Sequence, residues 1–330
     1  MTTMNNKYQG HFLKEYSPYP QGKYISILIV RKLESEAIFR TEGSGEGLNK
    51  EIVSSGIANK ENIPRVVISK RKQIAVERRS GRELLRNLSL LPEKCELNTN
   101  SPCGECIDCM LYGYAVGDGG AQKSRILSDD AFSLHSAYDI TGVKTFNALY
   151  ETGTMRDKEG NASSSINEDE YVRPESVFID IEVGKDLTFE EFQYAFGNIL
   201  RSKRYGAISS RIGSVKNIPL MLIFSDNELF SNLELTQAIY DIIKGEKESL
   251  QFPLNEIDIF NALKRAVDLL LKDFPGRATI VDQEDLANFQ KEITDLYQSD
   301  RIKTTLEDLQ SKYGNGTSSS KRKKSKKKKE

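Results

Sequence analysis

The chain has 330 residues and a formal net charge of −1. Its length allows one large domain with insertions or two domains, and no apolar run reaches the ~18 residues of a membrane span. Eight Lys or Arg lie among the last ten residues, so residues 1–320 hold 39 basic and 47 acidic residues, a net of −8. This balance excludes a protein that binds polyanions over its whole surface, and it predicts a soluble, cytoplasmic protein with no membrane partner.

The first predicted element is a buried strand near the N-terminus. Ile25–Val30 (ISILIV) is apolar and rich in β-branched residues, which is typical of a central strand covered on both faces. Residues 24–41 therefore predict this strand, a short connection and a second strand or strand end. From about residue 50 to residue 138 the sequence predicts irregular structure with one short helix at 81–91.

All four cysteines, Cys95, Cys103, Cys106 and Cys109, lie within fifteen positions in the run CELNTNSPCGECIDC. The spacing C-x7-C-x2-C-x2-C can place four thiolates on one tetrahedral ion, which favours a closed structural zinc site without an open catalytic position. An iron–sulfur cluster is an alternative, since the last three cysteines match part of a ferredoxin run, although the following C-x3-C-P is missing. Free or redox thiols are a further alternative. A disulfide is the weaker interpretation, because no secretory signal is seen.

A projecting hairpin is predicted in the middle of the chain. Two strands, at 145–160 and 169–183, flank the polar loop DKEGNASSSINED, which is too long for a tight turn. A helix to Lys203 follows, and Thr188 with Glu191 has the spacing of a capping box at its start.

The second half of the chain also alternates between predicted strands and helices. A basic, glycine-punctuated loop (RYGAISSRIGS), a buried strand at 218–224 and a helix at 233–243 come next. This order predicts an α+β fold with an RNA-recognition or ferredoxin-like sheet. Residues 253–312 look mostly helical.

These elements predict four regions. The sheet domain comprises residues 20–41 and 141–250, with the hairpin at about 145–183. Residues 42–140 form an inserted region that holds the cysteines, 251–312 form a helical C-terminal region, and 313–330 form a disordered basic tail. The tail either adds unspecific affinity for nucleic acid or aids solubility.

Basic residues also cluster in two internal stretches. In the first stretch, the candidate binding residues are Lys70, Arg71, Lys72, Arg78 and Arg79. In the second stretch, they are Lys203, Arg204, Arg211 and Lys216. Local positive grooves on an acidic body indicate one defined nucleic-acid track. Solvated helix faces are the alternative.

Five sequence elements together resemble a known family. They are SILIVRKLESEAIFRT, CGECIDCMLYGYAVG, SRILSDDAFSL, FNALYETGT and NILRSKRYGAISSRIG. Over roughly residues 20–230 they are similar, in this order, to the RAMP-type backbone subunit of CRISPR Cascade complexes, most closely the type I-D backbone protein. The resemblance implies a hand-shaped protein with an RNA-recognition-like palm, zinc-bearing fingers (42–140) and a thumb formed by the hairpin.

The same resemblance implies the partners. Copies would polymerise in a helical filament along CRISPR RNA, and each thumb would displace a base of the guide at regular intervals, so that the guide pairs with target DNA in short segments. A capping subunit of the same superfamily, a large subunit and a nuclease-helicase would complete the complex.

A backbone subunit that coats any guide must contact phosphates rather than bases. On this interpretation the RNA-binding residues are Arg31, Lys32, Arg40, Lys203, Arg204, Tyr205, Arg211 and Lys216. Tyr205 could stack on a base or fill the core, and the core is favoured. The stretch Lys70, Arg71, Lys72, Arg78 and Arg79 could contact the target DNA, or it could be a solvated face.

Catalysis is not expected. The two histidines, His11 and His135, have no partner in a recognisable acid–base arrangement. Related type III backbones cut RNA with a loop aspartate, which makes Asp129 and Asp130 the candidates for metal-dependent cleavage of a single-stranded target. An N-cap or turn carboxylate is the favoured interpretation. The main hypothesis is thus a Cascade backbone; a nuclease backbone and a stand-alone zinc-knuckle RNA-binding protein are the alternatives.

Overall fold

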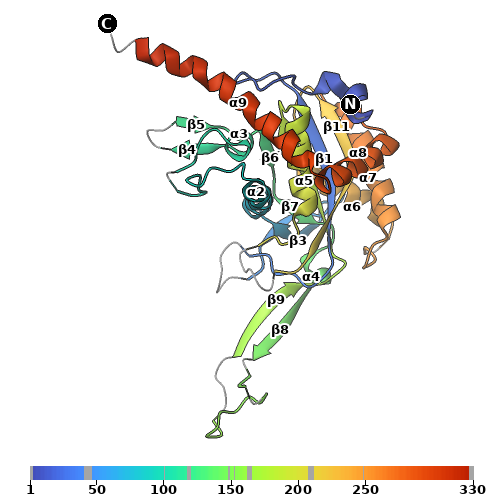
Figure 1. Cartoon of the computed structure of the whole chain (residues 1–330). Coiled ribbons are helices and arrows are strands. Elements are labelled where there is room, and N and C mark those ends of the chain that lie inside the picture. The colour runs from blue at the N-terminus through green and yellow to red at the C-terminus, as the bar shows by residue number, and fades with distance from the viewer. Residues whose placement is uncertain are drawn as a thin grey trace.

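An antiparallel sheet forms the centre of the molecule (Figure 1). The computed structural model describes residues 3–326, apart from 41–46, 100, 117–119, 148, 152, 162–165, 207–211 and 248. The three longest strands of the main sheet are β1 (Tyr24–Leu33), β10 (Val177–Lys185) and β11 (Val215–Ser225), and β1 pairs with both others. The apolar runs predicted as buried strands thus lie at the centre of the sheet, where both faces are covered.

Shorter strands extend this sheet on both sides. The strand order is β12-β11-β1-β10-β7-β3-β2, and β6 also pairs with β10. The added strands are β2 (Lys50–Ser54), β3 (Asn62–Ile68), β6 (Ile126–Ser128), β7 (Ala131–Ser133) and β12 (Ala278–Ile280). Two small sheets pair β4 (Tyr114–Val116) with β5 (Gly120–Gln122), and β8 (Thr141–Asn147) with β9 (Ile166–Val172).

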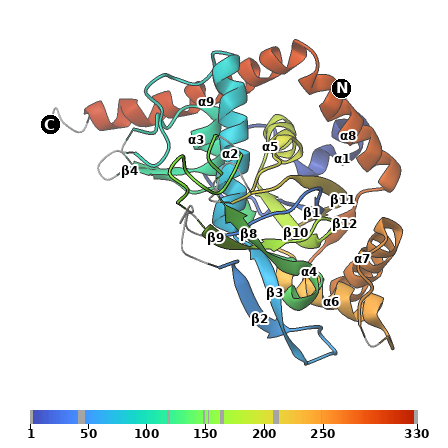
Figure 2. The same cartoon turned by 90° about the horizontal axis from the view of Figure 1, so that it is seen from below.

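Helices cover both faces of the main sheet (Figure 2). One face packs against α6 (Asn232–Lys244) and α7 (Glu256–Leu270). The other packs against α2 (Lys70–Asn87), α5 (Phe189–Arg201), α8 (Gln283–Tyr297) and the start of α9 (Arg301–Lys326). The remaining short helices are α1 (Thr3–Tyr8), η1 (Gln9–His11), α3 (Ile107–Tyr112), α4 (Ala137–Ile140) and η2 (Leu271–Asp273). The predicted α+β architecture is confirmed.

Helix α5 begins as the sequence predicts. Thr188 accepts a hydrogen bond from the backbone N–H of Glu191, and the Glu191 carboxylate accepts one from the Thr188 backbone N–H. Both halves of the capping box are therefore present. Gly81 then lets α2 lie close to α5, since a Cβ at this glycine would come within 2.4 Å of the Asn198 and Tyr194 side chains.

The region 42–140 is not a separate insertion, which corrects the predicted division of the chain. Strands β3 and β7 belong to the main sheet, and α2 packs against α5. Helix α2 also begins at Lys70 rather than at residue 81. Its buried side includes the polar residues Gln73, Glu77 and Arg82, so its sequence lacks the apolar periodicity by which a packed helix is predicted.

The predicted hairpin exists, but its bounds differ. It is formed by β8 and β9, with Thr141 opposite Val172, and it projects away from the rest of the molecule (Figure 1). The predicted second strand, 169–183, is divided between β9 and β10, because Pro174 follows β9 and Glu175 adopts a φ of 68° in the turn between them. The tip residues 162–165 lie outside the described residues.

Helix α9 closes the fold at the C-terminus. Ile302, Leu306, Leu309 and Tyr313 are buried against the sheet-facing helices. The helix backbone continues to Lys326, over most of the tail that composition predicts to be disordered, as an extension of these packed turns. No helix among the described residues is both long enough and apolar enough to span a membrane.

Candidate nucleic-acid cleft and metal centre

The four cysteine sulfurs converge on one point. The Sγ atom of Cys95 lies 3.6 Å from that of Cys109 and 3.9 Å from that of Cys106, and Cys103 Sγ lies 3.9 Å from Cys109 Sγ. All four lie within 4.8 Å of one another and none is in a disulfide. Bonds of ~2.3 Å to one tetrahedral ion would set the sulfurs about 3.8 Å apart. The site therefore fits a single ion, whereas several iron atoms would separate the sulfurs further.

The backbone around the cysteines also points at the sulfurs. The N–H groups of Cys103, Cys106 and Cys109 lie 3.4, 3.3 and 3.4 Å from the Sγ atoms of Cys95, Cys103 and Cys106 respectively. Gly104 has a φ of +72°, which turns the chain between the second and third cysteines. Such donors stabilise negative sulfur, as a bound cation requires.

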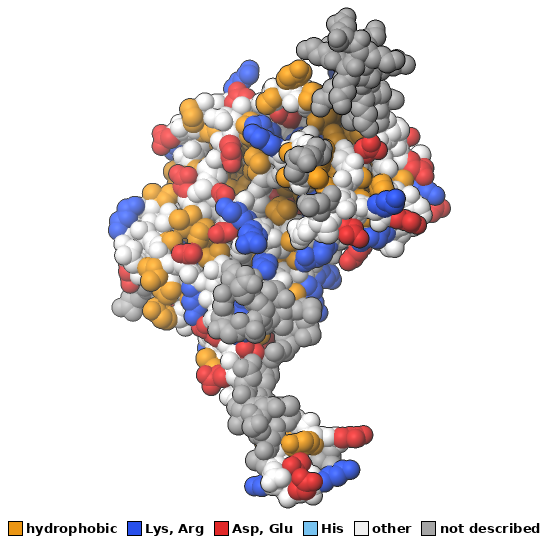
Figure 3. Space-filling view, turned by 90° about the vertical axis from the view of Figure 1, so that its left-hand side faces the viewer, with side chains coloured by type: hydrophobic (Ala, Val, Ile, Leu, Met, Phe, Trp, Pro, Cys, Tyr) orange, Lys and Arg blue, Asp and Glu red, His pale blue; other side chains and the backbone are white. Residues whose placement is uncertain are grey.

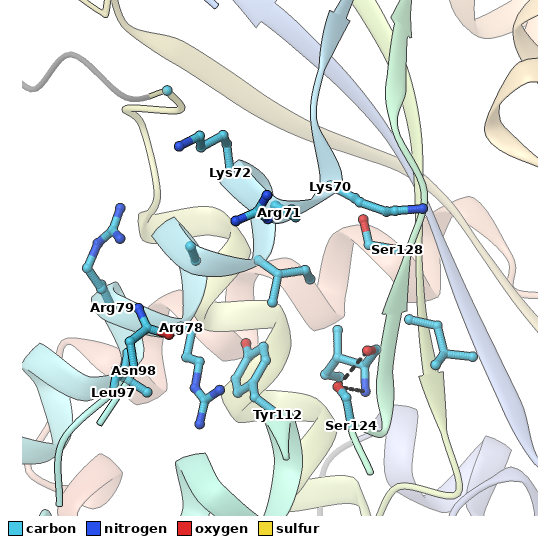
Figure 4. Close-up of a pocket in the computed structure, with 15 residues that line it drawn as sticks. Lys70, Arg71, Lys72, Arg78, Arg79, Leu97, Asn98, Tyr112, Ser124 and Ser128 are labelled. Atoms are coloured by element: carbon cyan, nitrogen blue, oxygen red, sulfur yellow. Dashed lines mark hydrogen bonds between the residues drawn. The ribbon is translucent and has the colours of Figure 1, made fainter. Parts of the chain in front are cut away.

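A cleft of about 850 Å³ lies beside this centre (Figure 4). Three elements form its walls: the exposed side of α2, the knuckle loop at Leu97 and Asn98, and the segment from Ser124 to Ser128 that includes β6. Apolar side chains of Ile74, Tyr112 and Ile126 also line it. A cleft with apolar and aromatic surface and a basic rim suits single-stranded nucleic acid.

The basic rim is formed by most of the residues predicted to contact target DNA. Lys70, Arg71 and Arg79 are exposed, Lys72 is half-buried, and all four line the cleft. None of these four forms an ion pair with another described residue, whereas Arg78 is bound by Asp108 at 2.9 Å. Figure 3, which views this side of the molecule, shows Lys and Arg gathered above the projecting hairpin.

The second basic stretch reaches the same region. Lys203, Arg204 and Lys216 are exposed and form no ion pair within the described ranges, while Arg211 lies outside the described residues. Gly206, in the loop after α5, lines the cleft together with Lys72. Among the described residues of this stretch only Gly206 lines the cleft, and Lys216, opposite Lys32 in the sheet, lies on the face that points away from α2.

Two predicted RNA contacts lie in the interior instead. Arg31 and Tyr205 are fully buried. The Arg31 guanidinium lies 2.8 Å from the Tyr205 hydroxyl and 2.8 Å from Asp180, and it also bonds Glu77 and Glu182. These contacts leave neither side chain any surface for RNA, which corrects the prediction for Arg31 and agrees with the favoured core position of Tyr205.

This interior cluster sets one arginine against three carboxylates. Burial raises the pKa of Glu182 well above its ordinary value, with Glu77 adding to the effect and Arg31 opposing it. Tyr205 also donates to Glu77 at 2.9 Å and receives a bond from Asn217 at 2.8 Å. The cluster therefore ties α2, the sheet and the loop after α5 together behind the cleft.

Lys32 and Arg40, also predicted to contact RNA, are both engaged in ion pairs. Lys32 lies on the opposite face of β1 from Arg31 and is 2.8 Å from Glu175 and 3.0 Å from Glu256. Arg40 is buried and lies 2.6 Å from Asp169, in the middle of β9. Arg40 thus anchors the hairpin.

Asp129 and Asp130 connect β6 to β7. The Asp130 carboxylate accepts a hydrogen bond of 2.8 Å from the backbone N–H of Lys70, the first residue of α2. The Asp129 side chain is exposed. Among the described residues, the cysteines are the only group of three or more side chains placed to share a metal ion. Asp130 is not the N-cap residue of α2, which is Ser69, but its carboxylate accepts from the first N–H of that helix as a capping carboxylate does.

Replacing Asp130 with alanine is expected to lower the stability of the chain by about 0.5–2 kcal/mol, because it removes an acceptor at the start of α2. Replacing Asp129 should change stability by about 0.5 kcal/mol or less. Thermal unfolding of the two variants compares the loss of the hydrogen-bonded Asp130 side chain with the loss of its exposed neighbour, Asp129. An equal shift in both would mean that the Asp130 bond contributes nothing.

Comparison with known proteins adds to this geometry. The sequence model of a family described as Csc2 Crispr matches residues 11–306. The crystal structure of Thermofilum pendens Csc2 is similar with a TM-score of 0.56 and 18% identity over 90% of each chain. Chains from a CRISPR RNA-guided surveillance complex and from its pre-nicking form cover 82% of this chain and 99% of their own at 10% identity, with TM-scores of 0.48 and 0.50. The comparison with curated proteins found no match.

Proposed function

Because this chain belongs to the Csc2 family of CRISPR proteins, we propose that it is the backbone subunit of a type I-D-like Cascade effector that polymerises along CRISPR RNA. The family membership confirms the resemblance to RAMP-type Cascade backbone subunits that five sequence elements indicate. The subunit binds the guide and presents it for pairing with target DNA.

The observation that carries this proposal is the basic cleft. Lys70, Arg71, Lys72 and Arg79 line it, and the exposed Lys203 and Arg204 precede Gly206, which also lines it. Long flexible cations without protein partners contact phosphates and carry no base preference. A guide of any sequence can therefore occupy the cleft, which is what a backbone subunit requires.

The palm of the proposed hand is a ferredoxin-like sheet. The order β11-β1-β10-β7 places the fourth, first, third and second core strands side by side, with α2 and α5 packed against each other on one face. This arrangement supports the RNA-recognition-like palm. The β8–β9 hairpin is the thumb, and in a filament its projecting end reaches the guide bound by the neighbouring copy.

The metal is proposed to be structural zinc. Four thiolates in tetrahedral reach of one point are the ligand set that Zn²⁺ takes in closed sites. The ion neutralises charge and holds the knuckle, and no coordination position is left for a reacting group. The fingers that the resemblance implies, residues 42–140, therefore include this knuckle, whose last cysteine lies on α3.

The partners follow from the same proposal. In a Cascade, the filament is completed by a capping subunit of the same superfamily, a large subunit and a recruited nuclease-helicase. We propose a scaffold role rather than catalysis, with Asp130 holding the start of α2. Guide-dependent cleavage of a single-stranded target that disappears in the Asp129 and Asp130 double alanine variant would contradict this assignment.

The proposal predicts that the number of bound copies rises with RNA length. Purified protein is mixed with RNAs of increasing length and unrelated sequence, and the mass of each complex is measured in solution. Stepwise growth is expected because the cleft contacts phosphates that repeat along every RNA. A single stoichiometry at every length would instead favour a stand-alone zinc-knuckle RNA-binding protein.

A further inference from the structure

The metal knuckle forms one wall of the basic cleft. Leu97 and Asn98 lie between the first two cysteines, and Tyr112 ends the helix that carries Cys109; all three line the cleft (Figure 4). Tyr112 is fixed by the main core and by a hydrogen bond from Asn198, whereas the position of Leu97 and Asn98 depends on how the cysteine loop is held.

A buried chain of charges joins the metal site to α2. Asp108, between Cys106 and Cys109, is fully buried. It accepts hydrogen bonds from Arg82 at 2.7 Å and from Arg78 at 2.9 Å. Arg82 Nη1 also lies 3.6 Å from Cys95 Sγ, and its other amino group donates to the Cys95 carbonyl.

Arg78 connects this chain to the cleft. It comes from α2, donates to the Gly113 carbonyl at 2.9 Å and itself lines the cleft. Asp108 thus fixes two arginines of α2 against the segment that carries the last two cysteines.

The main core holds α3, which carries Cys109, through Ile107, Met110 and Leu111, but it includes none of the described residues between Cys95 and Cys106. The apolar cluster around Cys95, Cys106 and Cys109 includes only Leu91 and Tyr114 besides Cys103. Several backbone N–H groups of the loop, those of Cys103, Glu105, Cys106 and Cys109, point at sulfur atoms. A bound ion therefore orders the loop, because it holds the four sulfurs at which these N–H groups point in one place.

We propose that the metal centre positions the knuckle wall of the cleft through Arg82, Asp108 and Arg78, so that metal occupancy controls the affinity for single-stranded RNA. This inference rests on the proposed function, because it takes RNA as the ligand of the cleft. Arg82 and Asp108 are positioning residues: the metal acts on RNA binding by shaping the cleft rather than by touching the RNA.

Whether RNA binding becomes weaker or tighter when the metal is removed distinguishes positioning of the cleft wall from simple electrostatics. Four thiolates around Zn²⁺ carry a charge of about −2, and the metal-free site with protonated thiols is neutral. Losing the metal therefore makes this side of the chain more positive, and electrostatics alone predicts tighter RNA binding. Positioning predicts weaker binding. Asp108→Asn removes a negative charge and keeps all four cysteines. For this variant, too, electrostatics alone predicts tighter RNA binding and positioning predicts weaker binding.

The experiment uses the full chain with a labelled uridine homopolymer of fixed length. Fluorescence anisotropy gives the dissociation constant for the zinc-loaded protein, the chelated protein and the chelated protein refilled with Zn²⁺. We expect chelation to weaken binding about tenfold and refilling to restore it, with the melting transition of the sheet domain retained. Asp108→Asn should weaken binding similarly while still holding about one Zn²⁺ per chain.

Asp268→Asn is the matched control, since Asp268 is exposed on α7, on the other face of the sheet. Unchanged or tighter binding in both the chelated protein and Asp108→Asn would overturn the inference and leave the proposed function standing. Loss of the whole folded signal on chelation would also overturn it, because the metal would then support the entire fold. If Asp108→Asn does not fold, the chelation series decides. Failure of the zinc-loaded wild-type chain to bind RNA would instead overturn the proposed function.

Discussion

Replacing Arg31 with leucine is expected to destabilise the chain by about 3–5 kcal/mol, because the change leaves three buried carboxylates without their cation. Arg31 contacts Glu77, Asp180 and Glu182 in the interior, and all four side chains are shielded from solvent. The leucine cannot satisfy these acids, and they must take up protons to remain buried. Urea unfolding of the variant and of the wild-type chain measures the difference.

The loss should grow with pH. Burial raises the pKa of Glu182 in the folded chain, and Arg31 lowers it, so the variant raises it further. A carboxyl with a raised folded pKa contributes stability fully below its unfolded pKa and loses that contribution as pH rises through the folded value. The variant should therefore be closer to wild type at about pH 5 than at about pH 8.

The next residue provides the control. Lys32→Leu removes a partly exposed ion pair with Glu175 and Glu256 and should cost about 1 kcal/mol or less. Equal unfolding midpoints for the two variants at both pH values would show that Arg31 does not neutralise the interior cluster.

Reversing the charge of Arg71, Lys72 and Arg79 to glutamate is expected to weaken RNA binding by about a thousandfold or more at low salt. Each charge-assisted contact is worth about 1.5–3 kcal/mol, and three contacts are removed. The plot of log affinity against log salt should also become shallower by about 2, since each phosphate contact on a single strand contributes ~0.7. Anisotropy titrations over a salt series give both quantities.

A matched triple reversal on the far face tests whether net charge alone is responsible. Lys264, Arg265 and Lys272 are exposed on or next to α7 and give the same change in charge. This control should retain most of the affinity and the steeper salt dependence. Equal losses in the two triple variants would mean that RNA is attracted to the chain as a whole and not to the cleft.

The sequence predicts the elements whose local signals agree with their packing. The apolar runs of β1 and β11 lie at the sheet centre, and α5 starts at the predicted capping box. The cysteine cluster is also predictable, since four thiols in fifteen positions can reach one ion only in a compact loop.

Other features depend on contacts between distant residues. Helix α2 buries Glu77 and Arg82 on partners such as Arg31 and Asp108, so its inner side is polar in sequence. Arg31 looks like a charged strand end after an apolar run, yet it points inward and finds acids from β10 and α2. No local pattern shows that Asn98, from the knuckle, meets α2 across the cleft.

The outer and inner sides of helix α2 are subject to different sequence constraints. On its outer side, the proposed function requires only that Arg71 and Arg79 remain long and positive, because any cation can contact a phosphate. On its inner side, Glu77 has fixed partners and Gly81 has no room for a Cβ. Substitutions on the outer side should therefore be tolerated as long as the side chain stays positive. Substitutions on the inner side should be tolerated only if they keep both the shape and the charge of the side chain.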